Sequence, residues 1–333
     1  MKYAKRALPL MLAFVLLCLS LAGCSGSGSD STPGSTPGSD QSASQEPTSQ
    51  EEAVKTTPVE DLSYQIVDNT VIIKGYLGDD THLVLPGTIE GKKVVTIGEK
   101  AFWQSNIQSI VLPDNVMLIE EYAFGHCEAL TSVQLSGRLK TIEKYAFYEC
   151  TALQKIEIPA SVTSLRGFAD CPNLSEVIIA DGVTKIEIDA FRGCTALTKI
   201  EIPGSVTSLS GFADCTNLSE VKLSAGISQI EIFAFENCTA LTKIEIPDSV
   251  TYISYHAFGY TGLTEVVIPD SVTGIYASFE GCKDLRSVTG PEDMELYRRH
   301  AFYNCPNDMT LNGEPFPSDF YSGMGGPARP ADR

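Results

Sequence analysis

Hydrophobic and polar residues alternate in short segments of this chain. In the segment KIEIP at residues 155–159, isoleucines alternate with charged residues, which predicts a short strand with one buried face. The proline ends this strand because it has no N–H to donate to a ladder. Further apolar residues follow at Val162, Leu165 and Phe168. Together these positions define one unit of about 22 residues.

The unit returns at a regular spacing along most of the chain. Its copies begin at Ile107, Leu130, Leu153, Leu174, Leu197, Leu218, Leu241, Leu263 and Leu285, and an atypical copy begins near Leu83. A repeat of this length is typical of a solenoid in which each repeat forms one coil and the strands stack as a parallel sheet. Because no coil can bury its apolar face alone, neighbouring coils are expected to share one continuous core.

A closer repeat is superimposed on the first, because KIEIP also starts at residues 199 and 243. In the predicted sheet, one outward column reads Ser109, Ser132, Lys155, Glu176, Lys199, Glu220, Lys243, Glu265 and Ser287. Its charged members alternate in sign, so neighbouring strands place opposite charges side by side. Two explanations of this closer repeat stay open. In the first, attraction between neighbouring charges, worth about 0.2–1 kcal/mol per exposed contact, fixes the register of the coils. In the second, a two-coil unit was duplicated.

These residues resemble the BspA-like leucine-rich repeats, whose pattern is L-x-x-I-x-I-P-x-x-V-x-x-I-x-x-x-A-F-x-x-C. The resemblance extends from about Leu62 to Asn307 and includes the opening segment YQIVDNTVIIKGYLGDD. It implies an α/β repeat solenoid, a right-handed leucine-rich-repeat stack of about ten coils with a parallel β-sheet on one face. It also implies a cell-surface protein, since members are known or proposed as adhesins, some of which bind host matrix or plasma proteins. No catalytic residues come with the family.

The chain begins with the parts of a bacterial export signal. Three basic residues precede an apolar run from Ala7 to Leu21, which is too short for a comfortable membrane span. The run ends in LAGC, which resembles the lipid-attachment signal of bacterial lipoproteins. That resemblance implies that residues 1–23 are removed and that Cys24 carries a diacylglyceryl group. The alternative is an ordinary secretory signal with an incidental cysteine.

Composition divides the rest of the chain into four parts. Residues 24–60 are rich in Ser, Gly, Pro and Thr and poor in large apolar residues, which predicts a flexible tether behind the lipid. Residues 61–106 are expected to form an N-terminal cap and the first coil, and residues 107–307 the repeats. A C-terminal cap and a disordered tail are expected over residues 308–333.

Charge and motifs argue against several functions. The chain has 24 Lys and Arg against 42 Asp and Glu, a net charge of −18, which argues against nucleic acid and against an anionic membrane face as partners. None of the four histidines has a metal-ligand spacing, and no catalytic or cofactor motif occurs. We therefore expect no enzyme, no metal and no cofactor.

A lipid-anchored, monomeric binding module on the cell surface is the leading interpretation. Its partner is an unidentified protein or glycan, such as a host matrix or mucosal component, and its only membrane contact is the lipid on Cys24. The alternative is an architectural spacer without a specific ligand.

Two columns of the predicted stack indicate core positions. One holds the phenylalanines Phe102, Phe124, Phe147, Phe168, Phe191, Phe212, Phe235, Phe258, Phe279 and Phe302. The other holds the cysteines Cys127, Cys150, Cys171, Cys194, Cys215, Cys238, Cys282 and Cys305. An even number of cysteines in an exported protein favours disulfides. Ser105 and Thr261 take the same position in two other coils, and this favours small, buried, free thiols instead.

Candidate binding residues lie where the outward columns are uncharged. A ligand on the central charges would have to break and desolvate existing pairs, which costs affinity. The predicted binding residues are Ser109, Val111, Ser132 and Gln134 near the N-terminal end, Val267, Ser287 and Thr289 near the C-terminal end, and Trp103, the single tryptophan. A further column before the Ala-Phe pairs places Tyr122, Tyr145, Phe233, His256 and His300 along an outer rim.

The lipid assignment is testable in a membrane fraction. Cys24→Ala is expected to move the protein from the detergent phase to the aqueous phase of a detergent partition, because the anchor is lost. Continued partition of the variant into detergent would show that Cys24 is not the attachment point.

Overall fold

The computed structural model describes residues 55–291 and 301–316. Cys24, the predicted signal, most of the predicted tether and the predicted C-terminal tail beyond residue 316 lie outside these residues. Thr57 is already packed on the solenoid, since it is buried and its N–H donates to the Val84 carbonyl at 2.8 Å. The chain therefore joins the solenoid before the expected end of the tether.

The N-terminal end is a small mixed sheet rather than a regular coil. Its elements are the 3₁₀ turn η1 (Val59–Asp61) and the strands β1 (Leu62–Val67), β2 (Thr70–Tyr76), β4 (Thr88–Ile89) and β5 (Lys92–Ile97). Strands β1 and β2 form an antiparallel hairpin whose two turn residues, Asp68 and Asn69, both have positive φ. Such a turn matches the twist of the two strands. Strand β2 then pairs in parallel with β5, which starts the stack.

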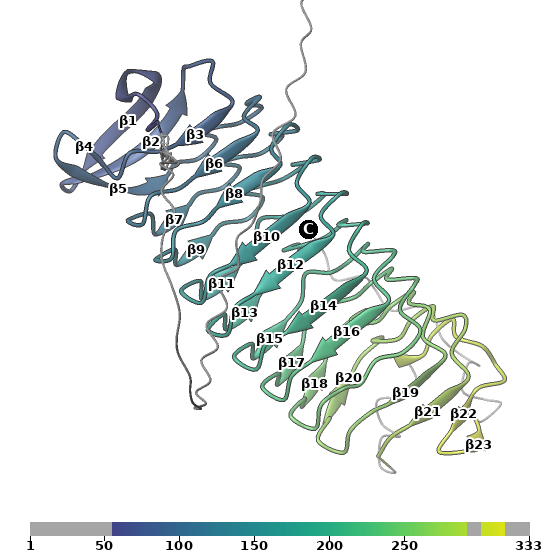
Figure 1. The fold of residues 1–333 in the computed structure, drawn as a ribbon. Coiled ribbons are helices and arrows are strands. Elements are labelled where there is room, and N and C mark those ends of the chain that lie inside the picture. Colours follow the sequence, from purple (N-terminus) through teal and green to yellow (C-terminus); the bar gives the residue numbers. More distant parts are fainter. Residues whose placement is uncertain (1–54, 292–300, 317–333) are drawn as a thin grey trace, which may run out of the picture. The chain divides into compact units, whose positions relative to one another are not determined.

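Each regular coil has three parts, which we call the first side, the second side and the turn segment. The first-side strands are β3 (His82–Val84), β6 (Ser109–Val111), β8 (Ser132–Gln134), β10 (Lys155–Ile158), β12 (Glu176–Ile179), β14 (Lys199–Ile202), β16 (Glu220–Leu223), β19 (Glu265–Val267), β21 (Ser287–Thr289) and β22 (Thr310–Leu311). The second-side strands are β7 (Leu118–Ile119), β9 (Thr141–Ile142), β11 (Ser164–Leu165), β13 (Lys185–Ile186), β15 (Ser208–Leu209), β17 (Gln229–Ile230), β18 (Tyr252–Ile253) and β20 (Gly274–Ile275). The turn segment follows and carries the Phe and Cys positions. Figure 1 shows the coils following one another along the stack.

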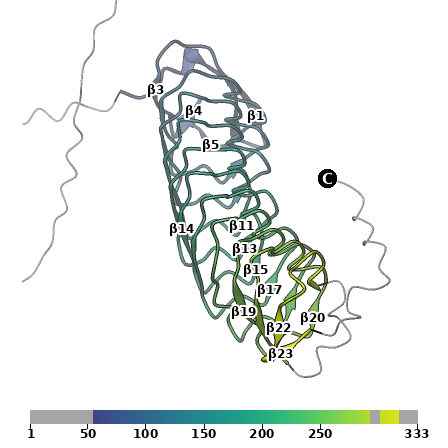
Figure 2. The ribbon, with the colours of Figure 1, turned by 90° about the vertical axis from the view of Figure 1, so that its right-hand side faces the viewer.

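The continuous sheet of the solenoid is on the second side. Strands β1, β2 and β5 lead into β7, β9, β11, β13, β15, β17, β18 and β20, with β4 paired to β5. All pairings from β5 to β20 are parallel and join equivalent residues of successive coils, for example Leu165 with Ile142 and Ile186. The leucine-rich-repeat stack predicted from the sequence is therefore confirmed, and Figure 2 shows it from a second direction.

Two details of the predicted fold are corrected. The strands that contain KIEIP do not form one sheet, because the first side is divided into the ladders β3-β6-β8, β10-β12, β14-β16 and β19-β21-β22. The last of these ends in an antiparallel strand, β23 (Glu314–Pro315). The helical part of the expected α/β class is also small, since helix within the described residues is limited to η1 and Ala301. Tight turns replace helices, because residues with positive φ, such as Tyr122 and His126, interrupt the return segments.

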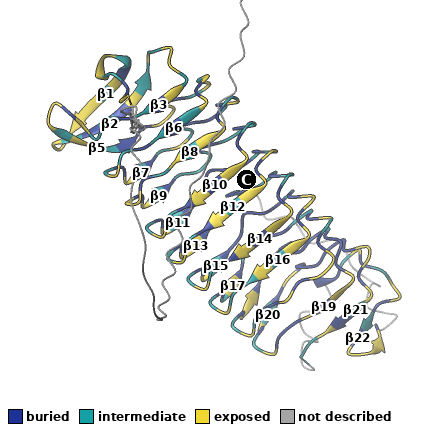
Figure 3. Ribbon diagram, in the orientation of Figure 1, coloured by how far each residue is buried: buried dark blue, intermediate teal, exposed yellow. Residues whose placement is uncertain are grey.

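The core is built from columns of identical side chains. The ten predicted phenylalanines are each at most 1% exposed, and successive rings lie 4.8–5.7 Å apart with interplanar angles of 3–16°. Burial alternates along the first-side strands, as in β10 and β14, where both isoleucines are buried and Lys and Glu are exposed (Figure 3). The predicted core positions are therefore confirmed.

The cysteine column joins each coil to the one before it. All eight cysteines are buried and free. Each thiol donates to the carbonyl oxygen of the phenylalanine in the preceding coil at 2.9–3.3 Å, as Cys127 does to Phe102. Thr261, which replaces cysteine in one coil, is also buried, but its hydroxyl donates at 2.9 Å to Phe258 of its own coil rather than to the preceding coil. The prediction of small, buried, free thiols is confirmed.

These thiols are expected to be chemically inert in the folded protein. Burial raises the pKa of Cys127, Cys171 and Cys215 to about 12, so the reactive thiolate is scarce at neutral pH. Iodoacetamide is expected to leave the eight thiols of the column unmodified in the native chain and to label all eight after denaturation without a reductant. Mass spectrometry counts the labels, and fewer labels after denaturation would reveal disulfides.

Candidate binding grooves on the first side

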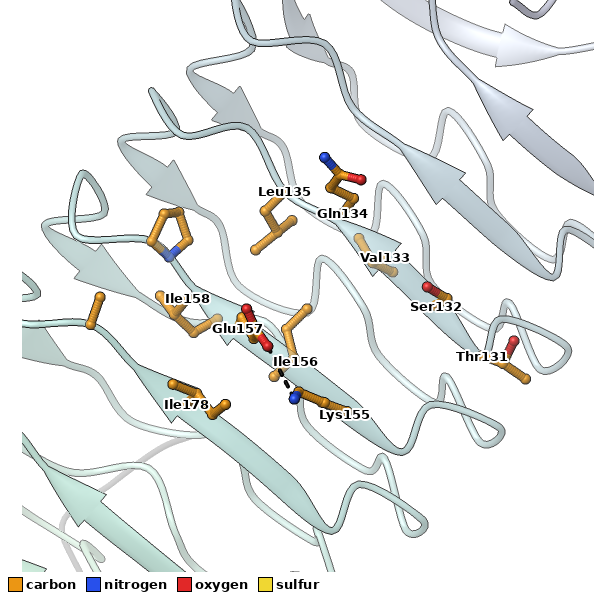
Figure 4. Close-up of a pocket in the computed structure, with 12 residues that line it drawn as sticks. Thr131, Ser132, Val133, Gln134, Leu135, Lys155, Ile156, Glu157, Ile158 and Ile178 are labelled. Atoms are coloured by element: carbon orange, nitrogen blue, oxygen red, sulfur yellow. Dashed lines mark ion pairs between the residues drawn. The ribbon is translucent and has the colours of Figure 1, made fainter. Parts of the chain in front are cut away.

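The first-side face opens where its ladder is interrupted between β8 and β10. A groove of about 630 Å³ runs along this opening, and Figure 4 shows the side chains that line it. Ser132 and Gln134 come from β8, Lys155 and Glu157 from β10, and Ile178 from β12. The groove therefore spans three successive first-side strands.

Apolar and polar groups alternate along this groove. Val133 and Leu135 are half-buried on the β8 side, and Ile178 is 43% exposed, although it lies in the middle of the face. Ser132 and Gln134 are exposed and offer a hydroxyl and an amide beside these apolar groups. An apolar surface with a few polar groups is the usual composition of a binding site.

The backbone along the groove has no ladder partner. Within the described residues, β8 bonds to β6 and β10 bonds to β12, but no backbone hydrogen bond joins β8 to β10. The two coils are nevertheless packed closely, since their rings Phe147 and Phe168 lie 4.8 Å apart and β9 pairs with β11 on the second side. No further strand fits between β8 and β10, so the groove is a surface over which a partner lies.

The charges beside the groove are compensated within the chain. The Lys155 Nζ lies 2.9 Å from Glu176 and 3.0 Å from Glu157, and hydrogen bonds to these carboxylates raise the pKa of Lys155. Lys155 pairs with Glu176 in register, as the alternating column predicts. Lys199 and Glu220 also pair in register, yet among the described residues Lys199 makes no ion pair within 4.0 Å.

A second groove of about 670 Å³ lies between β12 and β14, where the ladder is interrupted again. Lys199, Glu201, Glu220 and Lys222 supply its charges, and Ile178 lines this groove as well as the first. The exposed Ile178 therefore separates two grooves and contributes apolar surface to both.

The predicted binding residues fall into three separate places. Ser109 and Val111 on β6 lie opposite Ser132 and Gln134 on β8, so the N-terminal patch is assembled and borders the first groove. The C-terminal patch is assembled on β19 and β21, where Val267, which is 61% exposed, lies opposite Thr289, and Ser287 lies opposite Glu265.

Trp103 belongs to neither patch. It lies in a turn segment, where its ring packs against Tyr122, Gly125 and His126. The grooves themselves and the role of Ile178 were not predicted. The only signal in the sequence is that an isoleucine stands in an outward column whose neighbours at 157 and 201 are glutamates.

Sequence comparison assigns the family. The profile of the BspA type leucine rich repeat region matches residues 95–211, 165–278 and 276–314, in six copies, and these ranges cover more than half of the chain. The chain belongs to the BspA-type leucine-rich repeat family. No curated protein sequence matches it closely enough to extend this assignment.

This BspA-type chain is similar to solved structures of other leucine-rich repeat proteins. The leucine rich repeat protein of T. pallidum is 29% identical, with a TM-score of 0.50 over 56% of this chain and 91% of that one. A leucine-rich repeat protein from Bacteroides ovatus is 24% identical, with a TM-score of 0.48 over 75% of this chain and 69% of that one. A leucine rich cell surface protein from Faecalibacterium prausnitzii is 23% identical, with a TM-score of 0.39 over 78% of this chain and 94% of that one.

Some kinds of site do not occur in the described part of this BspA-type protein. Residues 55–291 and 301–316 contain no cluster of three His, Cys, Asp or Glu side chains placed to hold a metal ion. Over the same residues, no helix has the length and hydrophobicity needed to cross a bilayer.

One buried histidine forms a polar link across three coils of the BspA-type stack. His256 is 4% exposed and lies 2.8 Å from Glu236 through Nδ1 and 2.8 Å from Glu280 through Nε2. Tyr255 stacks on the imidazole at 4.0 Å, and the Tyr260 hydroxyl donates to Glu280. A neutral imidazole has a single N–H, so two carboxylate contacts require the protonated form.

This link is expected to make stability depend on pH. Burial lowers the pKa of His256, but the hydrogen bonds to Glu236 and Glu280 outweigh it and raise the pKa above its usual 6.5. The stabilisation is then complete below about pH 6.5 and is lost as the pH rises through the raised pKa. His256→Gln is expected to lower the free energy of unfolding by about 3 kcal/mol at acidic pH and to flatten this dependence.

Urea unfolding at several pH values measures both effects, and the exposed His82 supplies the control variant His82→Gln. A pH dependence that persists unchanged in His256→Gln would show that other groups are responsible.

Proposed function

We propose that this chain is a lipid-anchored, extracytoplasmic binding protein that holds an extended segment of a partner protein in the groove between β8 and β10. The export signal and Cys24 support the location, and the BspA-type repeats support a role in protein interaction. Adhesion to a host or mucosal surface is the biological setting that fits this arrangement.

The exposed apolar surface along the groove is the observation that carries this proposal. A partner segment lies over the groove rather than between β8 and β10, because the two coils are packed at a single strand spacing. Its apolar side chains cover Val133, Leu135 and Ile178, which would otherwise stay partly in water. Ser132 and Gln134 supply hydrogen bonds beside these apolar contacts. A catalytic role has no comparable support, because no group in the groove has the partners of a nucleophile or a general base.

The first test is site-specific photo-crosslinking on cells. A photoreactive amino acid at Gln134 is expected to capture a defined partner protein, because this side chain is exposed and lines the groove. Gln229 is the matched control, since it is also an exposed glutamine but lies on β17, on the second side.

A second variant identifies the groove as the cause of capture. Ile178→Asp is expected to weaken capture at Gln134 about tenfold, because it places a charge on the apolar surface between the two grooves. Folding should be kept, since Ile178 is exposed. Equal capture at Gln134 and Gln229, or none at either position, would favour an architectural spacer.

A further inference from the structure

A second surface, independent of the grooves, is formed by aromatic side chains on the first turn segments. Trp103, Tyr122, His126, Tyr145 and Tyr148 come from three successive coils and form one cluster, which we call the aromatic cluster. Trp103 lies 5.4 Å from Tyr122 and 4.5 Å from His126. Tyr122 stacks on Tyr145 at 5.3 Å, and Tyr148 lies 5.2–5.3 Å from His126 and Tyr145. All five rings remain partly exposed.

Trp103 is held in one position by its neighbours. A Cβ atom at Gly125 would lie 2.5 Å from the indole, so the ring rests against the backbone of a residue that has to be glycine. Tyr122 and His126 meet the indole nearly edge-on, at 81° and 74°. A ring that is fixed before binding loses little entropy when a ligand stacks on it.

The fold itself does not require these aromatic residues. Trp103 and Tyr148 follow the phenylalanine of their coils, and in later coils the same position holds Arg192, Glu236 and Glu280. The phenylalanine column continues through those later coils at the same spacing, as in the 5.3 Å contact between Phe191 and Phe212. A second aromatic group lies later in the stack around Tyr255 and His256, but both of these rings are buried, whereas the five rings of the aromatic cluster are partly exposed.

Polar groups border the aromatic cluster. Glu149 lies 3.0 Å from His126, and a hydrogen bond to Glu149 raises the pKa of Tyr148 to about 12, so this hydroxyl stays protonated. Lys144 lies 4.4 Å from the centre of the Tyr145 ring and 3.8 Å from Asp189. The Glu149 carboxylate thus lies beside the rings as an acceptor, and the Lys144 ammonium lies over the Tyr145 ring as a donor.

We infer that the aromatic cluster binds a neutral, hexose-based glycan. The C–H face of a pyranose ring stacks on Trp103, while its hydroxyls bond to groups such as Glu149 and Lys144. Stacking needs only single rings at intervals, and this cluster provides them, whereas it offers no exposed aliphatic surface. The carboxylates at its border and the net charge of −18 disfavour uronic and sialic acids.

The test uses native gel electrophoresis of the mature chain with Cys24→Ala, in gels that contain one soluble polysaccharide. Mixed-linkage β-glucan and α-mannan are the neutral probes, and polygalacturonate is the anionic probe. At least one neutral probe is expected to retard the protein, and polygalacturonate is not. Because Trp103 is the single tryptophan, the same neutral probe is also expected to change the tryptophan fluorescence.

Variants locate the binding surface. Trp103→Ala and Tyr145→Ala are expected to weaken binding of the retarding probe about tenfold. The first removes the stacking ring, and the second removes the ring that packs on Tyr122, the neighbour of Trp103. Tyr252→Ala is the control, since Tyr252 is also an exposed tyrosine, at 40%, but lies on the second-side strand β18. The affinity of this variant for the probe should be unchanged. Circular dichroism checks that each variant is folded. If Trp103→Ala destabilises the coil, Tyr145→Ala still tests the surface, because it keeps Trp103 as the fluorescent group.

Three results would overturn the inference: no retardation by either neutral probe, retardation that persists in folded Tyr145→Ala, or stronger retardation by polygalacturonate. None of them bears on the groove, because capture at Gln134 is measured on another side of the coil. Equally, if no partner is captured at Gln134, a neutral glycan is still expected to retard the protein.

Discussion

The structure depends on one constraint: no coil can bury its apolar residues without a coil on each side. The phenylalanine rings stack at 4.8–5.7 Å, and each cysteine thiol bonds to a carbonyl of the preceding coil, so the same few positions hold every pair of neighbours together. The stability of such a stack comes mainly from the contacts between neighbouring coils, and a single repeat is not stable alone. These buried positions therefore have to be kept in every copy, whereas the outward positions are free to differ.

The sequence predicts the buried part of the fold well for the same reason. A residue type that recurs in all or most copies, such as Phe168 or Cys171, appears as a column and can be assigned to the core. The second-side sheet was missed because strands such as Ser164–Leu165 have two residues, and alternation cannot be recognised over so short a stretch. Helix was expected from the family resemblance, but residues with positive φ, such as Tyr122 and His126, interrupt the return segments.

The candidate sites were harder to predict because they depend on departures from the repeat. The first groove exists because β8 and β10 are not joined by hydrogen bonds, and residue types do not determine that detail. Trp103 was grouped with Ser109 and Val111, which are close to it along the chain, but a coil turns between its sides and places the indole with Tyr122 and His126. A column predicts which residues are stacked, but it does not give the distance between columns on different sides.

The outward surfaces then explain why one stack can support two kinds of binding. The first side offers a groove with apolar side chains such as Ile178, which suits a polypeptide, and the turn segments offer rings fixed by residues such as Gly125, which suit a sugar. Both surfaces lie in the N-terminal half of the stack, on backbone that is held in place by the phenylalanine and cysteine columns. Because outward substitutions do not disturb those columns, either surface can change its ligand while the solenoid keeps its fold.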